Sequence, residues 1–274
     1  MLDLVKTLAP GSRVLDLGAG GGSFPSERSD LKVVRVDLRT PVPRASGVYA
    51  VADAAELPFI SDCFDLAVSN HSLEHFLRLE ETVREIGRVL RAGGVFYVAV
   101  PDATTLTDRI YRWLARGGGH VNAFRSPEEV VGLVERLTGL PHRTTRVLYS
   151  SLSFLNAHNF VTRPPRKIAL FAFGHEGFLA VFTWILRVLD RVLGTRLSQY
   201  GWTFHFGGEA TPAAAESWVN VCVRCGSGHS EAYLRKSATM HRAFVLLQTY
   251  RCPACGGFNL LTPEQPTRPA IPVP

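Results

Sequence analysis

The stretch VLDLGAGGGSF, residues 14–24, decides the fold of the first two thirds of this 274-residue chain. Apolar residues run into Asp16 and then into glycines at alternate positions, Gly18, Gly20 and Gly22. This pattern predicts a buried parallel strand that ends in a tight turn, because glycine makes such a turn without a Cβ clash. The turn brings bare backbone close to a ligand, and a carboxylate at the strand end favours a ligand that carries positive charge.

A second acidic residue supports this interpretation. The apolar run 31–36 predicts a second strand, and it ends in Asp37, twenty-one residues after Asp16. An acid at the tip of the second strand of a Rossmann-like sheet can accept hydrogen bonds from both ribose hydroxyls of a nucleoside cofactor. The two acids and the glycine turn therefore predict a cofactor site at the carboxyl ends of these strands.

The arrangement Asp16-x-Gly18-x-Gly20-x-Gly22 resembles the first motif of class I S-adenosylmethionine-dependent methyltransferases, of the kind called methyltransferase type 11. The resemblance covers residues 10–153 and returns near residue 217. It implies an α/β fold, a Rossmann-like seven-stranded sheet, with S-adenosylmethionine as cofactor. The cofactor-binding residues that it implies are Asp16, near the ammonium group, Gly18, Ala19, Gly20, Gly22, Asp37, Leu38, Asp53, Ala54 and Asn70.

Asp53 is the third acidic candidate, and the resemblance implies that it meets the adenine amino group. It lies in the loop ADAAELPF, residues 52–59. Acids are common in loops, so Glu56 or Asp62 could take the place of Asp53.

Two histidines are candidate catalytic residues. His120 follows the glycines 117–119 and precedes a capping-box helix start at Ser126, which predicts a helix over 127–137. In relatives of the family a loop of this kind lies over the substrate pocket, and His71 lies in the segment beneath the methyl donor. Either imidazole could remove the proton of a hydroxyl acceptor. The alternative is a surface or structural role for each.

The region before the last predicted strand is unusually apolar. We predict the sixth strand at 142–154 and the seventh at 217–223, so that residues 155–212 form a hydrophobic insertion in a methyltransferase domain 1–221. Within it, residues 168–193 lack an uninterrupted apolar stretch of the ~20 residues that span a bilayer. We favour a lid over the pocket or a homodimer interface; the alternative is a helix at the membrane surface that reaches a lipid-linked acceptor.

Four cysteines near the C-terminus form two Cys-x-x-Cys pairs, each followed by glycine. Four thiolates at this spacing predict a closed structural Zn²⁺ site in a zinc-ribbon-like module, residues 222–262, with strands at 231–236 and 243–251. Two disulfides are the alternative, which an intracellular enzyme disfavours. The proline-rich tail 263–274 is predicted to be disordered. The four predicted ligands are Cys222, Cys225, Cys252 and Cys255.

The composition and charge of the chain indicate which classes of partner it can bind. The chain is 46% hydrophobic and 20% charged with a formal net charge of +6, which predicts a large core and favours anionic partners such as nucleic acid or an acidic membrane face. The first residues lack the features of a signal peptide, so we expect a cytoplasmic protein, with the membrane surface as a further possibility.

The segment Ser69-Asn70-His71-Ser72 stands where many base or amide N-methyltransferases carry Asn/Asp-Pro-Pro-aromatic. The resemblance therefore favours an oxygen atom of a small-molecule, glycan or lipid-linked acceptor. Two other hypotheses are an RNA methyltransferase whose ribbon binds RNA, and a non-catalytic partner protein with the same fold.

Overall fold

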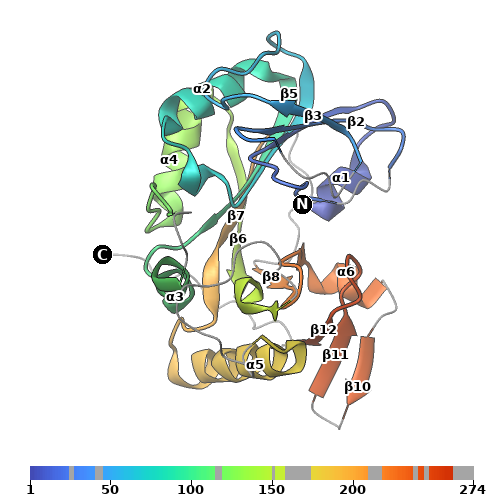
Figure 1. Cartoon of the computed structure of the whole chain (residues 1–274), viewed down its shortest axis with the longest axis vertical. Helices are drawn as coiled ribbons and strands as arrows, with labels where there is room; N and C mark the ends of the chain where they lie inside the picture. Colours follow the sequence, from blue (N-terminus) through green and yellow to red (C-terminus); the bar gives the residue numbers. More distant parts are fainter. Residues whose placement is uncertain are drawn as a thin grey trace. The chain divides into compact units, whose positions relative to one another are not determined.

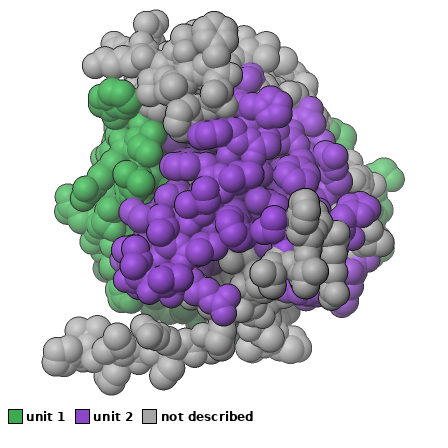
Figure 2. Space-filling model, turned by 90° about the horizontal axis from the view of Figure 1, so that it is seen from below, with its two compact units in different colours: residues 1–145, 200–213 green, residues 146–199, 214–274 purple. Residues whose placement is uncertain are grey.

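The computed structural model describes residues 1–24, 28–40, 46–114, 119–149, 152–157, 174–208, 218–236, 240–243 and 247–261. The chain divides into two compact units, coloured separately in Figure 2. Unit 1 comprises residues 1–145 and 200–213, and unit 2 comprises residues 146–199 and 214–274. Three predicted features lie wholly or partly outside the described residues: the tail 263–274, the glycines 117–118 and the stretches 158–173 and 209–212 of the insertion.

Unit 1 is an α/β structure built on a mixed sheet (Figure 1). The strand order is β3-β2-β1-β4-β5-β7-β6. The strands are β1 (Arg13–Leu17), β2 (Lys32–Asp37), β3 (Val48–Val51), β4 (Phe64–Asn70), β5 (Leu90–Pro101), β7 (Gln199–Gly207) and the first half of β6 (His142–Tyr149). The helices are α1 (Leu2–Thr7), the 3₁₀ helix η1 (Leu73–His75), α2 (Leu79–Val89), α3 (Leu106–Leu114) and α4 (Pro127–Thr138).

The core of unit 1 lies along its central strands. Strands β1 to β5 pair in parallel, and the side chains of Leu15 on β1, Leu66 on β4 and Val98 on β5 are fully buried. Such strands are apolar almost throughout because both faces of a parallel sheet are covered. Parallel pairing brings the carboxyl ends of β1, β2 and β4 to one edge, which is where the cofactor site was predicted.

Helix α4 confirms the predicted helix start. The hydroxyl of Ser126 accepts a hydrogen bond from the backbone N–H of Glu129 at 3.4 Å, and Pro127 occupies the first turn. The Glu129 carboxylate accepts from the backbone N–H of Arg125, one residue before the position expected for a capping box. The helix ends at Gly139 with φ +70°, the left-handed conformation that favours glycine.

The strand that completes the sheet is not the one that we predicted. Strand β7 pairs antiparallel with β5, from Gly207 opposite Val95 to Gly201 opposite Pro101, although residues 199–207 were assigned to the insertion. The physical reason is the alternation in 201–206, which buries Trp202, Phe204 and Phe206 on one face of the strand. The predicted seventh strand instead forms β8 (Trp218–Val221), which belongs to unit 2.

Unit 2 contains the rest of the insertion together with the cysteine-containing segment. Its elements are the second half of β6, the 3₁₀ helix η2 (Ser153–Leu155), α5 (Glu176–Leu193), β8, β9 (Gly228–His229), α6 (Glu231–Lys236), β10 (Met240–Ala243), β11 (Leu247–Arg251) and β12 (Phe258–Leu261). Strand β8 pairs in parallel with β6 and antiparallel with β9. Strands β10, β11 and β12 form a separate antiparallel sheet.

Helix α5 packs on the cysteine module. Leu179 and Ala180 form a buried cluster with Leu152 and Val223, and Phe258 at the start of β12 packs against it. This shared core is why residues 155–157 and 174–199 of the insertion group with the cysteine module, which differs from the predicted division at residue 221. Among the described residues, no helix has both the length and the apolar character that crossing a membrane requires.

The predicted strand 231–236 is also wrong, because these residues form helix α6. The hydroxyl of Ser230 accepts from the backbone N–H of Tyr233 at 3.2 Å, which satisfies a free donor of the first turn. The Arg235 guanidinium donates to the Glu231 carboxylate one turn earlier, a pairing that helix periodicity permits. The predicted strand 243–251 contains β11.

The close approach of β5 and β7 predicts a strong effect of one substitution. A Cβ at Gly201 would lie 2.0 Å from the carbonyl oxygen of Val100, whereas a Cβ at Gly132 in α4 meets nothing within 4 Å. We expect Gly201→Ala to lower the free energy of unfolding by about 3 kcal/mol or more. The matched Gly132→Ala should raise it by about 0.5–1 kcal/mol. Urea unfolding of both variants measures this, and equal midpoints would contradict the β5–β7 pairing.

Candidate functional site

The glycine turn after β1 has the conformation that its sequence predicted. Gly18, Gly20 and Gly22 have φ values of +62°, +51° and +117°, which side chains rarely adopt. A Cβ at Gly18 would lie 2.4 Å from the Cβ of Ser72. The Ser72 hydroxyl in turn donates to the carbonyl oxygen of Leu17 at 2.9 Å. The chain after β4 is therefore held directly against the turn, and any side chain at position 18 would separate them.

Asp16 lies beneath the turn. Its Oδ2 accepts a hydrogen bond from the backbone N–H of Ser23 at 2.9 Å and a charged hydrogen bond from the Arg35 guanidinium, and both side chains of this ion pair are fully buried. The same guanidinium donates to the carbonyl oxygen of Phe24 at 2.9 Å and lies over its ring. Its Oδ1 is buried without a hydrogen-bond partner among the described residues, so the predicted contact with the cofactor ammonium stays a prediction.

Asp37 lies at the end of β2, beside the turn. Its Oδ2 accepts from the backbone N–H of Gly20 at 2.9 Å, and its Oδ1 accepts from the backbone N–H of Arg39 at 3.1 Å. Asp53 accepts from the backbone N–H of Ala55 at 2.9 Å and forms an exposed ion pair with Arg78 at 3.4 Å. Both carboxylates are thus oriented by backbone donors.

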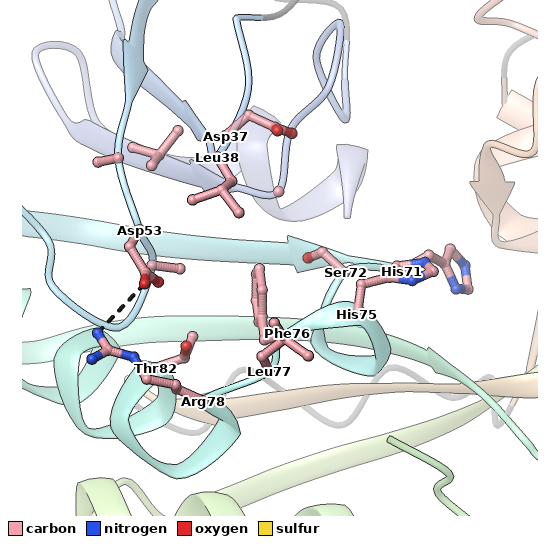
Figure 3. Close-up of a pocket in the computed structure, with 14 residues that line it drawn as sticks. Asp37, Leu38, Asp53, His71, Ser72, His75, Phe76, Leu77, Arg78 and Thr82 are labelled. Carbon is pink, nitrogen blue, oxygen red and sulfur yellow. Dashed lines mark ion pairs between the residues drawn. The ribbon is translucent and has the colours of Figure 1, made fainter. Parts of the chain in front are cut away.

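A pocket of about 410 Å³ opens at this edge of the sheet. Figure 3 shows Asp37 and Leu38 on one wall, Asp53 near Arg78, and the imidazoles of His71 and His75 at the other end. The predicted residues that line the pocket are Gly18, Asp37, Leu38, Asp53, Ala54 and His71. The other predicted residues of unit 1, which do not line it, are Asp16, Ala19, Gly20, Gly22, Asn70 and His120. Sequence reasoning missed the lining residues Ser72, Phe76, Leu77, Arg78 and Thr82.

Three histidines surround one buried carboxylate next to this pocket, and we call this group the histidine–glutamate cluster: His71, Glu74, His75 and His120. The Oε1 of Glu74 lies 4.0 Å from a ring nitrogen of each histidine. The Glu74 side chain is 1% exposed. Residues 71–75 come from the end of β4 and the helix η1, whereas His120 follows α3 by several residues.

The electrostatics of the cluster follow from burial. Burial raises the pKa of the Glu74 carboxyl group to about 8 and lowers the pKa of the His71 imidazole to about 4. Burial also lowers the pKa of His75. The imidazoles of His71 and His75 are therefore neutral at pH 7, and each has a nitrogen lone pair for a proton or a ligand.

Three residues of helix α3 surround His120, and the sequence analysis did not predict them. Its Nδ1 lies 2.7 Å from Oδ1 of the buried Asp108, and the Arg112 guanidinium donates to the same carboxylate at 2.5 Å. The Tyr111 ring stacks on the imidazole with centroids 4.6 Å apart. His120 is thus a buried and oriented residue, which differs from the pocket-facing position on a glycine hinge that we predicted. The acidic first turn of the helix 106–114 was the available signal.

The four predicted metal-ligand cysteines come together in unit 2. The Sγ atoms of Cys222 and Cys255 are 3.8 Å apart, and those of Cys225 and Cys252 are 3.7 Å apart. All four lie within 4.8 Å of one another, and none forms a disulfide. The glycine after each pair donates its backbone N–H back to the first cysteine of that pair, which closes the two turns.

Comparisons with known proteins agree with this geometry. Residues 15–98 match a family described as a methyltransferase domain. The malonyl-[acyl-carrier protein] O-methyltransferase of Methylococcus capsulatus is 29% identical over 184 residues, which are 58% of this chain and 67% of that protein. The ubiquinone biosynthesis O-methyltransferase of Rhizobium etli is 31% identical over 140 residues, 44% of this chain and 56% of that protein.

A solved structure supports the fold. The S-adenosylmethionine-dependent methyltransferase of Archaeoglobus fulgidus superposes with a TM-score of 0.50 at 18% identity, over 75% of this chain and 90% of that one. The predicted α/β Rossmann-like class is thereby confirmed.

The ion pair beneath the turn predicts a large loss of stability on removal of one partner. Arg35→Met leaves the Asp16 carboxylate buried without a counter-charge, so we expect the free energy of unfolding to fall by about 3–5 kcal/mol. The exposed Arg84→Met in α2 is the matched control and should cost less than about 0.5 kcal/mol. A double variant Asp16→Asn/Arg35→Met should lose less than the sum of the single variants. Chemical unfolding measures these three variants together with the single Asp16→Asn, and an additive double variant would contradict the pairing.

Proposed function

We propose, on the premise that this chain carries a class I S-adenosylmethionine-dependent methyltransferase domain, that it methylates an oxygen atom of a small-molecule acceptor. The observation that carries the proposal is the pocket at the carboxyl ends of the parallel strands, where Asp37 lies beside the glycine turn and Asp53 lines the same pocket. The names of both relatives, which are O-methyltransferases, support oxygen as the target. The absence of an Asn/Asp-Pro-Pro-aromatic sequence at 69–72 points the same way.

The pocket residues fit the proposed cofactor. The Asp37 carboxylate, held by Gly20, accepts hydrogen bonds from the ribose hydroxyls in this proposal. Asp53 receives the adenine amino group, and the glycine turn lies beside the methionine part. The absence of a side chain at Gly18 leaves room for close approach to the backbone.

Bound S-adenosylmethionine supplies an electrophilic methyl group. The chain contributes a position for the acceptor oxygen on the line of attack, because proximity and exclusion of water supply much of the rate of such a transfer. Of the two predicted bases, His71 lines the pocket, and we assign to it the removal of the acceptor proton. We do not assign His120 as a base, because its Nε2 faces the Glu74 carboxyl group and its Nδ1 faces that of Asp108.

Loss of Asp37 tests the cofactor assignment. We expect Asp37→Ala to weaken binding of S-adenosylmethionine and of its demethylated product about tenfold or more, because a charged hydrogen bond contributes about 1.5–3 kcal/mol. Glu128→Gln on the surface of α4 is the control and should bind like wild type. Calorimetric titration gives the affinities, and circular dichroism confirms folding. Unchanged affinity in Asp37→Ala would contradict the ribose contact.

Methyl transfer itself tests the function. Labelled S-adenosylmethionine is incubated with panels of small hydroxyl and carboxyl compounds, and with RNA as a competing acceptor. We expect label in the small-molecule panels and a loss of label with Asp37→Ala. Label in RNA alone, or cofactor binding with no transfer to any panel, would overturn the proposed acceptor class.

We also propose that the four cysteines hold one structural Zn²⁺. Four sulfurs at about 2.3 Å from one tetrahedral ion lie about 3.8 Å apart, which matches the observed separations. Backbone and side-chain donors approach the Cys222 sulfur, with the N–H of Arg224 at 3.3 Å and the amide of Asn259 at 3.4 Å. Such donors stabilise thiolates that ligate a metal.

Cysteine substitution tests the zinc site. We expect Cys252→Ser to lose one equivalent of zinc relative to wild type and to lose much of the structure of unit 2, because metal binding contributes directly to folding of such modules. Cys63→Ser is the matched control and should retain the zinc. Metal analysis by mass spectrometry measures both variants, and retention of zinc by Cys252→Ser would show that these cysteines do not hold it.

A further inference from the structure

The histidine–glutamate cluster holds buried polar atoms close together without satisfying them. The 4.0 Å separations between Glu74 Oε1 and the histidine nitrogens are too long for hydrogen bonds. Among the described residues, the other carboxylate oxygen of Glu74 is buried with no hydrogen-bond partner, and so is Nδ1 of His71. The described part of the chain pairs Glu74 with no lysine or arginine. A buried carboxylate in such a setting requires a cation or a proton.

Two of the three histidines around Glu74 are oriented alike. His75 and His120 both direct Nε2 toward Glu74 Oε1. Nδ1 of His120 lies 2.7 Å from the Asp108 carboxylate, and Nδ1 of His75 lies 3.4 Å from the backbone carbonyl of Gly119. A carboxylate or a carbonyl on the far nitrogen is the arrangement that orients histidines which ligate a metal, because it sets the tautomer and makes the near nitrogen a better donor.

The geometry points to a divalent metal site formed by Glu74, His75 and His120, for a transition-metal dication of the Zn²⁺ class. The ligand atoms of the three residues lie within 4.8 Å of one another. Ligands about 2.1 Å from a tetrahedral Zn²⁺ are about 3.4 Å apart, so the 4.0 Å separations need to shorten by about 0.6 Å. Imidazole and carboxylate donors suit this class of ion, and three protein ligands leave one position open.

The place of this site connects it with methyl transfer, and this step rests on the proposed function. His75 lines the cofactor pocket together with His71 (Figure 3). An acceptor hydroxyl at the open metal position becomes more acidic. Its proton passes to His71 and its oxygen bonds to the methyl carbon. The carbon–sulfur bond of S-adenosylmethionine breaks in the same step, and its electron pair stays on sulfur. In this scheme His120 is a ligand, and His71 remains the free base.

Cobalt binding to the full chain tests the site independently of activity. The protein is stripped with a chelator and titrated with Co²⁺ as the probe. We expect a second equivalent beyond the four-cysteine site, with d–d absorption and no thiolate-to-metal charge transfer. Glu74→Gln and His75→Ala should lose that spectrum and keep the thiolate bands, whereas Cys252→Ser should do the reverse. His241→Ala, on β10, is the control and should keep both.

Asp108, which contacts His120, provides a second test of the metal site. Asp108→Asn should weaken Co²⁺ binding at this site about 10–100-fold, with the thiolate site unchanged. A wild-type chain with thiolate-bound cobalt alone, or Glu74→Gln with both spectra intact, would overturn the inference. Calorimetric titration with S-adenosylmethionine on the stripped protein separates the two proposals. Cofactor binding and methyl transfer that are indifferent to the metal would overturn the role of the metal in transfer and leave the proposed function standing.

Discussion

The buried ion pair between Asp16 and Arg35 is the interaction on which the cofactor edge of unit 1 depends. Asp16 holds the glycine turn through the backbone of Ser23, and Arg35 ties the second strand to the end of the same turn at Phe24. One guanidinium thus links two strands and a loop. Burial of two charges is costly, and removal of one partner would leave the other charge buried without compensation. The backbone of the glycine turn is thereby held at both Ser23 and Phe24.

Buried polar groups need partners in the histidine–glutamate cluster as well. Asp108 is the partner of one ring nitrogen of His120, and Arg112 donates to Asp108 in turn. The second carboxylate oxygen of Glu74 and Nδ1 of His71 have no hydrogen-bond partner among the described residues. The proposed divalent cation is the partner that the Glu74 carboxylate lacks.

Unit 2 shows how an apolar helix and a small cysteine module stabilise each other. The module is small, and a domain of this size rarely buries enough surface alone. Helix α5 supplies Leu179 and Ala180 to a shared cluster, and its first residue, Glu176, accepts a hydrogen bond from the backbone N–H of Phe258. The four sulfurs are held by the turns that close on Cys222 and Cys252, and the Asn259 amide also donates to the Cys222 sulfur. The insertion thus has a structural role within its own unit.

The sequence by itself determined the features that depend on neighbours along the chain. The glycine turn with Asp16 and Asp37, the Ser126 helix start and the two Cys-x-x-Cys turns are local patterns, and each is found where it was predicted. Tertiary structure decided which strand fills the place beside β5, because β7 and β8 are both apolar and only pairing distinguishes them. It also decided the partner of Asp16 and the gathering of Glu74, His75 and His120. These depend on distances between segments up to 46 residues apart in sequence, which no local pattern encodes.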